Sequence, residues 1–304
     1  MDTRQKEELL RLGEKNIRFQ CPMAEYTTLK VGGPAEALYE AKSTQNLRRV
    51  LVYLHSENIP YVVLGRGSNV LITDKGLDGI VIRLCGSLSR VEEKRADDMS
   101  LLTGAGLHLM KLLNYCRRSA LGGLEFLSGI PGTVGGAVAM NAGAFGEEIG
   151  TKVKEIHMVD ERGKPVMRNH GKGFAFSYRQ FEMERGSVIV RVRLSLTPQS
   201  EGAVGKKISD YLSIKKESQP LEYPSAGSVF KNPPNDYAGR LIEKAGLKGT
   251  KIGGAVISEK HGNYILNTGR ARARDILDLI RLAQEKVKEE TGVELEPEIR
   301  VFGK

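Results

Sequence analysis

The chain has 304 residues, of which 40% are hydrophobic and 27% are charged, a composition typical of a globular protein and unlike that of a disordered one. Because a single hydrophobic core rarely grows beyond about 250–300 residues, two or three structural units are expected. The net charge of +9 comes from basic residues spread along the chain, without the dense Lys/Arg blocks of a nucleic-acid interface, and such a field would also attract polyphosphate ligands to an enzyme.

The first 85 residues are predicted to form a small α/β unit. An amphipathic helix is expected over residues 3–12, and β-favouring residues then run into a Gly-Gly-Pro turn. Beyond the turn we expect a strand at residues 35–40, a helix capped by Ser43 or Thr44, and a strand at residues 61–64 that stops at Gly65. The order strand, helix, strand is typical of a compact α/β unit.

The middle of the chain adds a second set of elements. Strands are expected at residues 79–84, 101–106, 156–160, 166–168 and 188–196, and a helix at residues 107–119. The polar stretch 198–205 has no clear pattern, so we place a domain boundary there.

The last hundred residues are expected to begin with a basic helix around residues 206–217. A Pro-bounded extended segment, a helix at residues 238–245 and a strand at residues 264–267 follow. A long helix then places Ile276, Ile280, Ala283 and Val287 on one face and stops at Gly292, and residues 297–302 close the chain as a strand.

No secretion signal, membrane span or metal site is predicted. The N-terminus opens with charged residues and lacks the apolar run of a signal peptide. The long uncharged stretch 126–146 is too rich in Gly and Ala to offer the apolar surface that a membrane span needs. The cysteines Cys21, Cys85 and Cys116 form no CxxC pair, so we interpret them as buried thiols of a cytoplasmic protein.

The first segment with a chemical signal is Leu64-Gly-Arg-Gly-Ser-Asn, directly after a predicted strand. Its two glycines allow a sharp turn close to a ligand, and Ser68, Asn69 and free backbone N–H groups can hold phosphate oxygens. It is not a GxGxxG dinucleotide motif, because the third glycine would fall at Val70. The alternative is a tight turn between two strands.

The second segment runs from Ser128 to Ala144 and consists almost entirely of small residues. Backbone of this kind packs against something that leaves no room for side chains. The run lacks the GK[ST] ending of a P-loop, which argues against an ATPase. A flat cofactor with a pyrophosphate is the natural partner, and close packing between helices is the alternative.

Together these segments resemble the FAD-binding domain of the vanillyl-alcohol-oxidase-like flavoproteins and, within that group, the shorter form of the UDP-N-acetylenolpyruvoylglucosamine reductases. The resemblance extends over residues 26–302. The peptides that carry it are Thr28-Leu-Lys-Val-Gly-Gly, the two segments above, Phe176-Ser-Tyr-Arg, Ala226-Gly-Ser-Val-Phe-Lys-Asn-Pro and Leu295-Glu-Pro-Glu-Ile-Arg. It implies an α+β protein with FAD-binding subdomains at 1–85 and 86–198 and an α+β substrate domain at 199–304, whose C-terminal strand returns to the active site.

The resemblance also implies a reaction. NADPH would reduce a non-covalently bound FAD, and the enolpyruvyl group of UDP-N-acetylglucosamine enolpyruvate would then be reduced to UDP-N-acetylmuramate for peptidoglycan synthesis. Arg179 would pair with the substrate carboxylate, and Glu298 would help Arg179 polarise it or would tune the serine. Ser228 would give its hydroxyl proton to the neighbouring carbon. The protein would act as a monomer in the cytoplasm, without membrane, nucleic acid or metal.

Further ligand contacts follow from the same resemblance. The residues assigned to FAD are Gly65, Arg66, Gly67, Ser68, Asn69, Ser128, Gly129, Pro131, Gly132, Thr133, Gly135, Gly136, Asn141 and Ala142. The residues assigned to the substrate are Tyr178, Lys216, Asn232 and His261, with Lys215 as an alternative to Lys216 for a phosphate. For the lysines a solvated helix face is an equal alternative, and for His261 an exposed loop.

Two rival functions remain open at this point. A flavin oxidase or dehydrogenase with another small substrate could share the FAD domain, but the motifs around Ser228 and Glu298 argue against it. A basic, non-catalytic nucleotide or nucleic-acid binder would be colourless. The longer form of the family carries an extra segment with a tyrosine that folds over the UDP-sugar. The stretch between Arg179 and Ser228 is too short to hold it, so the cover of the substrate is unassigned.

Overall fold

The computed structural model describes residues 1–95, 97, 99–169 and 175–303. The chain folds into two compact units, and each is assembled from segments that are distant in the sequence. Unit 1 comprises Met1–Phe19, Ala37–Gly65 and Gly79–Ser213, and unit 2 comprises Gln20–Glu36, Arg66–Asp78 and Ile214–Lys304. The finer division at 1–85, 86–198 and 199–304 stays a prediction.

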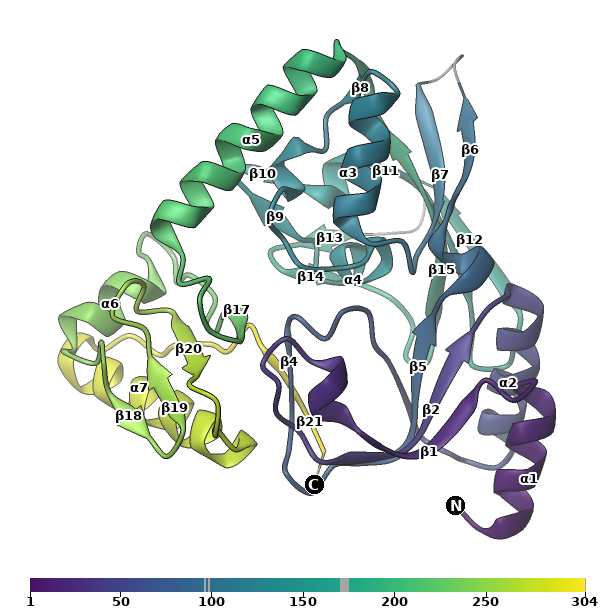
Figure 1. Cartoon of the computed structure of the whole chain (residues 1–304), viewed down its shortest axis with the longest axis horizontal. Helices are drawn as coiled ribbons and strands as arrows, with labels where there is room; N and C mark the ends of the chain where they lie inside the picture. The colour runs from purple at the N-terminus through teal and green to yellow at the C-terminus, as the bar shows by residue number, and fades with distance from the viewer. Residues whose placement is uncertain (96, 98, 170–174, 304) are drawn as a thin grey trace. The chain divides into compact units, whose positions relative to one another are not determined.

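Unit 1 contains a five-stranded antiparallel sheet (Figure 1). Its strands, in spatial order, are β12 (Pro165–Asn169), β11 (Val153–Val159), β15 (Val188–Ser195), β7 (Ser100–Gly104) and β6 (Val91–Arg95). The central strand β15 is buried along most of its length, in keeping with its five valine, isoleucine and leucine residues, which Arg191 and Arg193 interrupt. The expected strands at 101–106, 156–160, 166–168 and 188–196 are thus confirmed within three residues at each end.

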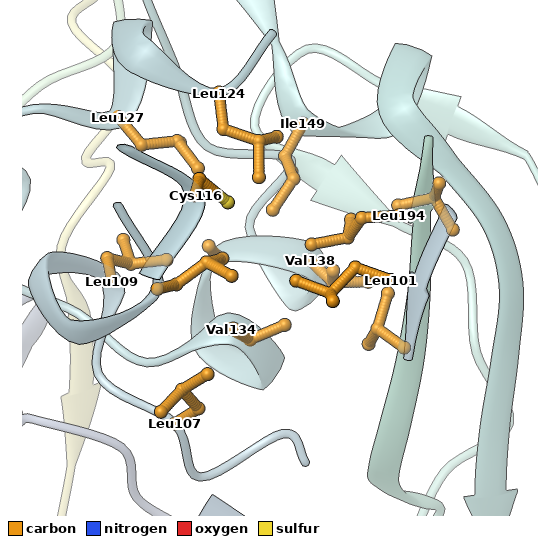
Figure 2. Close-up of a cluster of buried hydrophobic side chains, with 14 of the residues drawn as sticks. Leu101, Leu107, Leu109, Cys116, Leu124, Leu127, Val134, Val138, Ile149 and Leu194 are labelled. Carbon is orange, nitrogen blue, oxygen red and sulfur yellow. The ribbon is translucent and has the colours of Figure 1, made fainter. Parts of the chain in front are cut away.

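Helices α3 (Leu109–Arg118) and α4 (Val134–Ala139) contribute to the hydrophobic core beside this sheet. Figure 2 shows Leu109 and Cys116 of α3, Val134 and Val138 of α4, and the strand residue Leu194 gathered in this core. Helix α4 begins at the N-cap Thr133, whose hydroxyl accepts a hydrogen bond from the Gly136 N–H at 3.4 Å. The glycine-rich segment is therefore fixed by core packing on one side.

The remaining elements of unit 1 include the predicted N-terminal helices. Helix α1 (Thr3–Leu12) starts with a capping box at Asp2, and α2 (Thr44–Ser56) is capped by Ser43 and buries the apolar stripe that the sequence predicts. A four-stranded sheet, most of which lies in unit 1, has the order β1 (Ile17–Pro22), β2 (Pro34–Ala41), β5 (Leu77–Leu84) and β3 (Tyr61–Val63).

Short strands and single turns complete the chain. The short strand pairs are β8 (Leu121–Gly122) with β16 (Thr197–Pro198), β9 (Gly143–Ala144) with β10 (Glu147–Glu148), and β13 (Phe176–Ser177) with β14 (Gln180–Phe181). The 3-10 turns are η1 (Met23–Tyr26), η2 (Gly86–Ser89), η3 (Glu125–Leu127) and η4 (Ile149–Lys152).

Unit 2 is built on a four-stranded antiparallel sheet and two helices. The strand order is β17 (Ser225–Ser228), β20 (Tyr264–Asn267), β19 (Ala255–Ile257) and β18 (Lys251–Ile252), and the helices are α6 (Ala238–Lys244) and α7 (Ala273–Thr291). The predicted face of α7 is buried, and Gly292 ends the helix in the left-handed conformation. The C-terminal strand β21 (Arg300–Phe302) pairs in parallel with β4 (Val70–Ile72), the strand that follows the 65–69 segment.

One expectation about the elements is wrong. The polar stretch 198–205 is not all irregular, because helix α5 (Glu201–Ser218) already begins at Glu201. The Ser200 hydroxyl accepts a hydrogen bond from the Ala203 N–H at 3.2 Å, and Val204 and Ile208 bury one face of the first turns. Within the part of the chain described above, no helix is long and apolar enough to cross a membrane.

Candidate functional site

The two glycine-rich segments meet in unit 1. A Cβ atom on Gly65 would lie only 2.6 Å from the Thr133 hydroxyl oxygen, so the end of the first segment touches the N-cap of the helix in the second. Gly65, Thr133, Gly135 and Gly136 line a common cavity. Each segment was identified from its own sequence pattern, and the fold brings Gly65 of the first beside Thr133 of the second.

The second segment fits a bound ligand. Ser128 is fully buried, and no residue in the described ranges gives its hydroxyl oxygen a hydrogen-bond partner. A buried hydroxyl without a partner is costly, so a ligand atom that completes it would be favourable. A Cβ on Gly136 would contact nothing closer than the Thr133 hydroxyl at 3.4 Å, which leaves space on the cavity side of α4. These features suit FAD.

The rest of the first segment lies in unit 2 and is bound to the C-terminal strand. Gly67 has a φ of +63°, and a Cβ there would lie 2.2 Å from the Tyr26 carbonyl oxygen, so only glycine fits. The Asn69 side chain donates to the Glu298 carbonyl oxygen at 3.0 Å, and the Arg300 N–H donates to the Asn69 carbonyl oxygen at 3.0 Å. A predicted cofactor loop therefore contacts a predicted catalytic segment 229 residues further along the chain.

Ser228 and Glu298 also come together in unit 2. The Glu298 N–H donates to the carbonyl oxygen of Val229 at 2.7 Å, which places the two predicted catalytic residues on adjacent backbone segments. Ser228 stands opposite Tyr264 in the antiparallel pair of β17 and β20. Burial raises the pKa of Tyr264 to about 12, so its hydroxyl stays protonated at physiological pH.

Arg179, the third predicted catalytic residue, occupies the two-residue turn of the β13–β14 hairpin in unit 1. Its φ of +58° lies in the left-handed region, which costs a residue with a side chain about 1–3 kcal/mol. The guanidinium carbon lies 4.9 Å from the centre of the Tyr178 ring, a cation–π distance. Positive φ values are common in two-residue hairpin turns, so the catalytic role of Arg179 stays a prediction.

The other predicted FAD residues have varied surroundings. The residues of the second segment that lie outside the lining of the cavity are Ser128, Gly129, Pro131, Gly132, Asn141 and Ala142. Arg83 and His108 belong to the lining, and no sequence motif predicted either. Arg83 is also paired with Glu40 at 3.6 Å. The assignments outside the lining stay predictions.

The predicted substrate residues are distributed over unit 2 and the Arg179 hairpin. Asn232 is exposed, and its side-chain oxygen accepts a hydrogen bond from the Ala238 N–H at 3.1 Å, at the start of α6. The Nδ1 atom of His261 accepts from the Asn263 N–H at 3.2 Å, and burial lowers the pKa of this imidazole, so the neutral ring carries its proton on Nε2. Tyr178 is exposed.

The two lysines on α5 differ sharply. Lys216 is exposed, whereas Lys215 is buried, and burial lowers the pKa of the Lys215 amine from 10.5 to about 8. Between these two pH values the unfolded chain binds more protons than the folded protein, so the cost of burying this charge is full below pH 8 and disappears towards pH 10.5. The structure makes Lys215 the more unusual lysine of the pair.

We expect Lys215→Met to stabilise the protein at pH 7 by up to roughly 3 kcal/mol, since no charge is then buried. The gain should shrink as the pH rises above 8. Urea unfolding at pH 7 and pH 9.5 measures it, with the exposed Lys216→Met as control, for which a change within about 0.5 kcal/mol is expected. A less stable Lys215→Met at pH 7 would show that the charged amine is a net stabilising group.

Comparisons with known protein families match two parts of the chain. Residues 35–167 match a model described as FAD binding domain. Residues 219–302 match a model described as UDP-N-acetylenolpyruvoylglucosamine reductase, C-terminal domain. The first match covers Gly65 and the glycine-rich run, and the second covers Ser228 and Glu298.

Individual relatives cover almost the whole chain. The UDP-N-acetylenolpyruvoylglucosamine reductase of Caldanaerobacter subterraneus subsp. tengcongensis is 41% identical over 293 residues, which are 96% of this chain and 95% of the relative. The crystal structure of UDP-N-acetylenolpyruvylglucosamine reductase from Thermus caldophilus has a TM-score of 0.81 and 37% identity, covering 94% of this chain and 98% of that one. A structure of alkyldihydroxyacetonephosphate synthase is similar in fold alone. It has a TM-score of 0.50 and 11% identity, and the match covers 65% of this chain and 41% of that one.

Proposed function

The chain belongs to the UDP-N-acetylenolpyruvoylglucosamine reductase family, and we propose that it uses NADPH to reduce the enolpyruvyl group of UDP-N-acetylglucosamine enolpyruvate to UDP-N-acetylmuramate. It is an FAD-containing oxidoreductase with an α+β fold. The main observation that supports this substrate is the backbone hydrogen bond between Glu298 and Val229, which places Glu298 beside Ser228. The reaction needs a proton donor and a charged partner close together. The role in peptidoglycan synthesis, the cytoplasmic location and the monomeric state belong to the same proposal.

The cofactor would be held without a covalent bond by residues 65–69 and 128–136. Backbone N–H groups at turns of this kind bind pyrophosphate oxygens. When bound, FAD would supply the hydride chemistry that links NADPH to the enolpyruvyl double bond. The missing side chain at Gly136 leaves space in the cavity for it, and the one at Gly65 allows the close approach to Thr133.

The side chains of the protein would stabilise the charge that hydride addition creates and would donate the proton that completes the reduction. Hydride addition to an alkene conjugated with a carboxylate builds negative charge on that carboxylate, and Arg179 would neutralise it with a guanidinium held in a strained turn. Glu298 would orient Arg179 on the substrate or tune Ser228. Ser228 would deliver its hydroxyl proton to the carbon next to the carboxylate.

We propose that Tyr178, Lys216, Asn232 and His261 contact the substrate. A neutral His261 with the proton on Nε2 can donate a hydrogen bond to a sugar or phosphate oxygen. The buried Lys215 joins Lys216 as a candidate for the phosphates, because a lysine retained in spite of its burial cost is often functional.

Gly136→Val is expected to abolish FAD binding while leaving the fold intact. The nearest protein atom to a Cβ at this position is the Thr133 hydroxyl at 3.4 Å, so a larger side chain is tolerated by the protein and enters the cavity. FAD released on denaturation, measured per mole of purified protein, gives the occupancy, and circular dichroism checks the fold. Gly202→Val on α5, where a Cβ meets nothing within 4 Å, is the matched control. Full occupancy in Gly136→Val would remove the second segment from the cofactor site.

Two simple measurements test the function. The purified protein should be yellow, and its consumption of NADPH should depend on the enolpyruvyl sugar nucleotide. A colourless protein would support the rival function of a basic nucleotide or nucleic-acid binder. A yellow protein that ignores the enolpyruvyl sugar would instead indicate a flavin oxidase or dehydrogenase with another substrate.

A further inference from the structure

We propose that Asn141 is the positioning residue that holds the Arg179 hairpin in place, rather than a side-chain contact of FAD. This inference rests on the proposed function, because it assigns to Asn141 a part in the same reduction. It concerns residues of unit 1 only.

The Asn141 side chain is almost completely buried, with 1% exposure, and both its nitrogen and its oxygen are hydrogen-bonded within the protein. Its Nδ2 atom donates to the Ser177 carbonyl oxygen at 2.9 Å and to the Glu148 carboxylate at 2.8 Å. Its Oδ1 atom accepts from the Gly150 N–H at 3.0 Å. These partners, from the 148–150 stretch and the hairpin, use both N–H donors and one acceptor position of the amide, so the buried side chain needs no cofactor atom as a partner.

The contact with Ser177 matters because of its place in the chain. Ser177 pairs with Gln180 in the β13–β14 hairpin, and Tyr178 and Arg179 form the two-residue turn between them. A turn with a left-handed arginine persists only when surrounding structure determines it. The Asn141 amide is a direct, buried side-chain anchor on the first strand of this hairpin, two residues before Arg179.

Packing around the anchor agrees with this role. A Cβ on Gly143 would lie 3.3 Å from the Nη1 atom of Arg179, so the backbone just after Asn141 leaves room for the guanidinium. A Cβ on Gly150 would lie 2.7 Å from the Phe176 ring, so the hairpin packs closely against the segment that Asn141 holds through its Oδ1 atom. Residues 141–150 therefore form a support for the hairpin.

An isosteric change isolates the amide donors. Asn141→Asp keeps size and shape, but it removes both N–H donors and sets a carboxylate against the Ser177 carbonyl and the Glu148 carboxylate. The hairpin should then shift, and a displacement of about 1 Å in a catalytic group costs on the order of 100-fold in rate. We expect FAD content and flavin reduction by NADPH to stay within about twofold, and reoxidation by the enolpyruvyl sugar to slow about 100-fold.

Two controls make the test specific. Asn58→Asp changes another left-handed asparagine, exposed and remote in sequence from the hairpin, and should leave both half-reactions unchanged. In an Arg179→Ala background, Asn141→Asp should slow reoxidation less than about twofold further, since both changes remove the same interaction. A general loss of structure would add to the Arg179 defect instead.

The outcomes separate the inference from the function. Loss of FAD from a folded Asn141→Asp protein, or reoxidation at the wild-type rate, would overturn the positioning role alone. Wild-type enzyme that is not reoxidised by the enolpyruvyl sugar would overturn the proposed function and this inference with it. If Asn141→Asp does not fold, Asn141→Ser, which is neutral and too short to reach Ser177, is measured in the same way with the same expected and contrary results.

Discussion

Arg179→Ala should slow the reoxidation of pre-reduced flavin by the enolpyruvyl sugar nucleotide about 100- to 1,000-fold, and flavin reduction by NADPH should stay within about twofold. The reason is that negative charge develops on the substrate carboxylate only in the second half-reaction. Arg179→Lys should recover little of the lost reoxidation rate, because an ammonium group cannot form the paired hydrogen bonds that a guanidinium forms with a carboxylate. Stopped-flow absorbance measures the two half-reactions separately.

Glu298→Gln should also slow reoxidation and spare flavin reduction by NADPH, with a smaller loss of rate than Arg179→Ala. Arg185→Ala, at an exposed position, is the control for the loss of one positive charge in unit 1. Equal slowing of both half-reactions in Arg179→Ala would indicate a general defect. A collapse of the NADPH half-reaction alone would show that Arg179 serves NADPH and not the substrate carboxylate.

Ser228→Ala is expected to bind both substrates and to accept hydride from NADPH, but to stall when the enolpyruvyl group is reduced. A serine is a weak acid, so alanine removes the proton source without an easy replacement. Ser228→Cys should restore part of the rate, since a thiol is more acidic and has a similar reach. Single-turnover reoxidation of pre-reduced enzyme measures this step directly.

The alternative for Ser228 is that it only shapes the end of strand β17, opposite Tyr264. In that case alanine and cysteine would change affinity or stability, and the reoxidation rate at saturating substrate would stay near that of the wild type. Similar saturated rates for Ser228→Ala and the wild type would therefore remove Ser228 from the mechanism.

Local sequence patterns predicted most of the elements because they depend on short-range physics. The stripe of Ile276, Ile280, Ala283 and Val287 on α7 is buried, and Gly292 ends that helix in the conformation that favours glycine. The start of α5 was missed although Ser200 is a good N-cap, because the polar first turn hides the short apolar repeat.

The difference in burial between Lys215 and Lys216 follows from the apolar periodicity of helix α5. The buried positions Val204 and Ile208 on α5 continue through the half-buried Tyr211 to Lys215, a spacing of four, three and four residues. That periodicity places Lys215 on the apolar face of the helix and Lys216 off it.

The assembly of the site could not be read from any local pattern. Contacts of Gly65 with Thr133 and of Asn69 with Glu298 join segments that are far apart in the sequence, and they depend on how the sheets and helices pack. Arg83 and His108 line the cavity from elements without a motif. The anchoring of the Arg179 hairpin by Asn141 likewise appears only in three dimensions.

The central claim is that the protein passes electrons from its flavin to an enolpyruvyl group carried on a UDP-sugar. The most direct measurement mixes photoreduced holoenzyme with UDP-N-acetylglucosamine enolpyruvate under anaerobic conditions and follows the flavin absorbance. We predict full return of the oxidised flavin spectrum, with one UDP-N-acetylmuramate formed per FAD, and no return with UDP-N-acetylglucosamine, which lacks the double bond. Flavin that stays reduced in the presence of the enolpyruvyl sugar, or that reoxidises equally with both sugars, would contradict the claim.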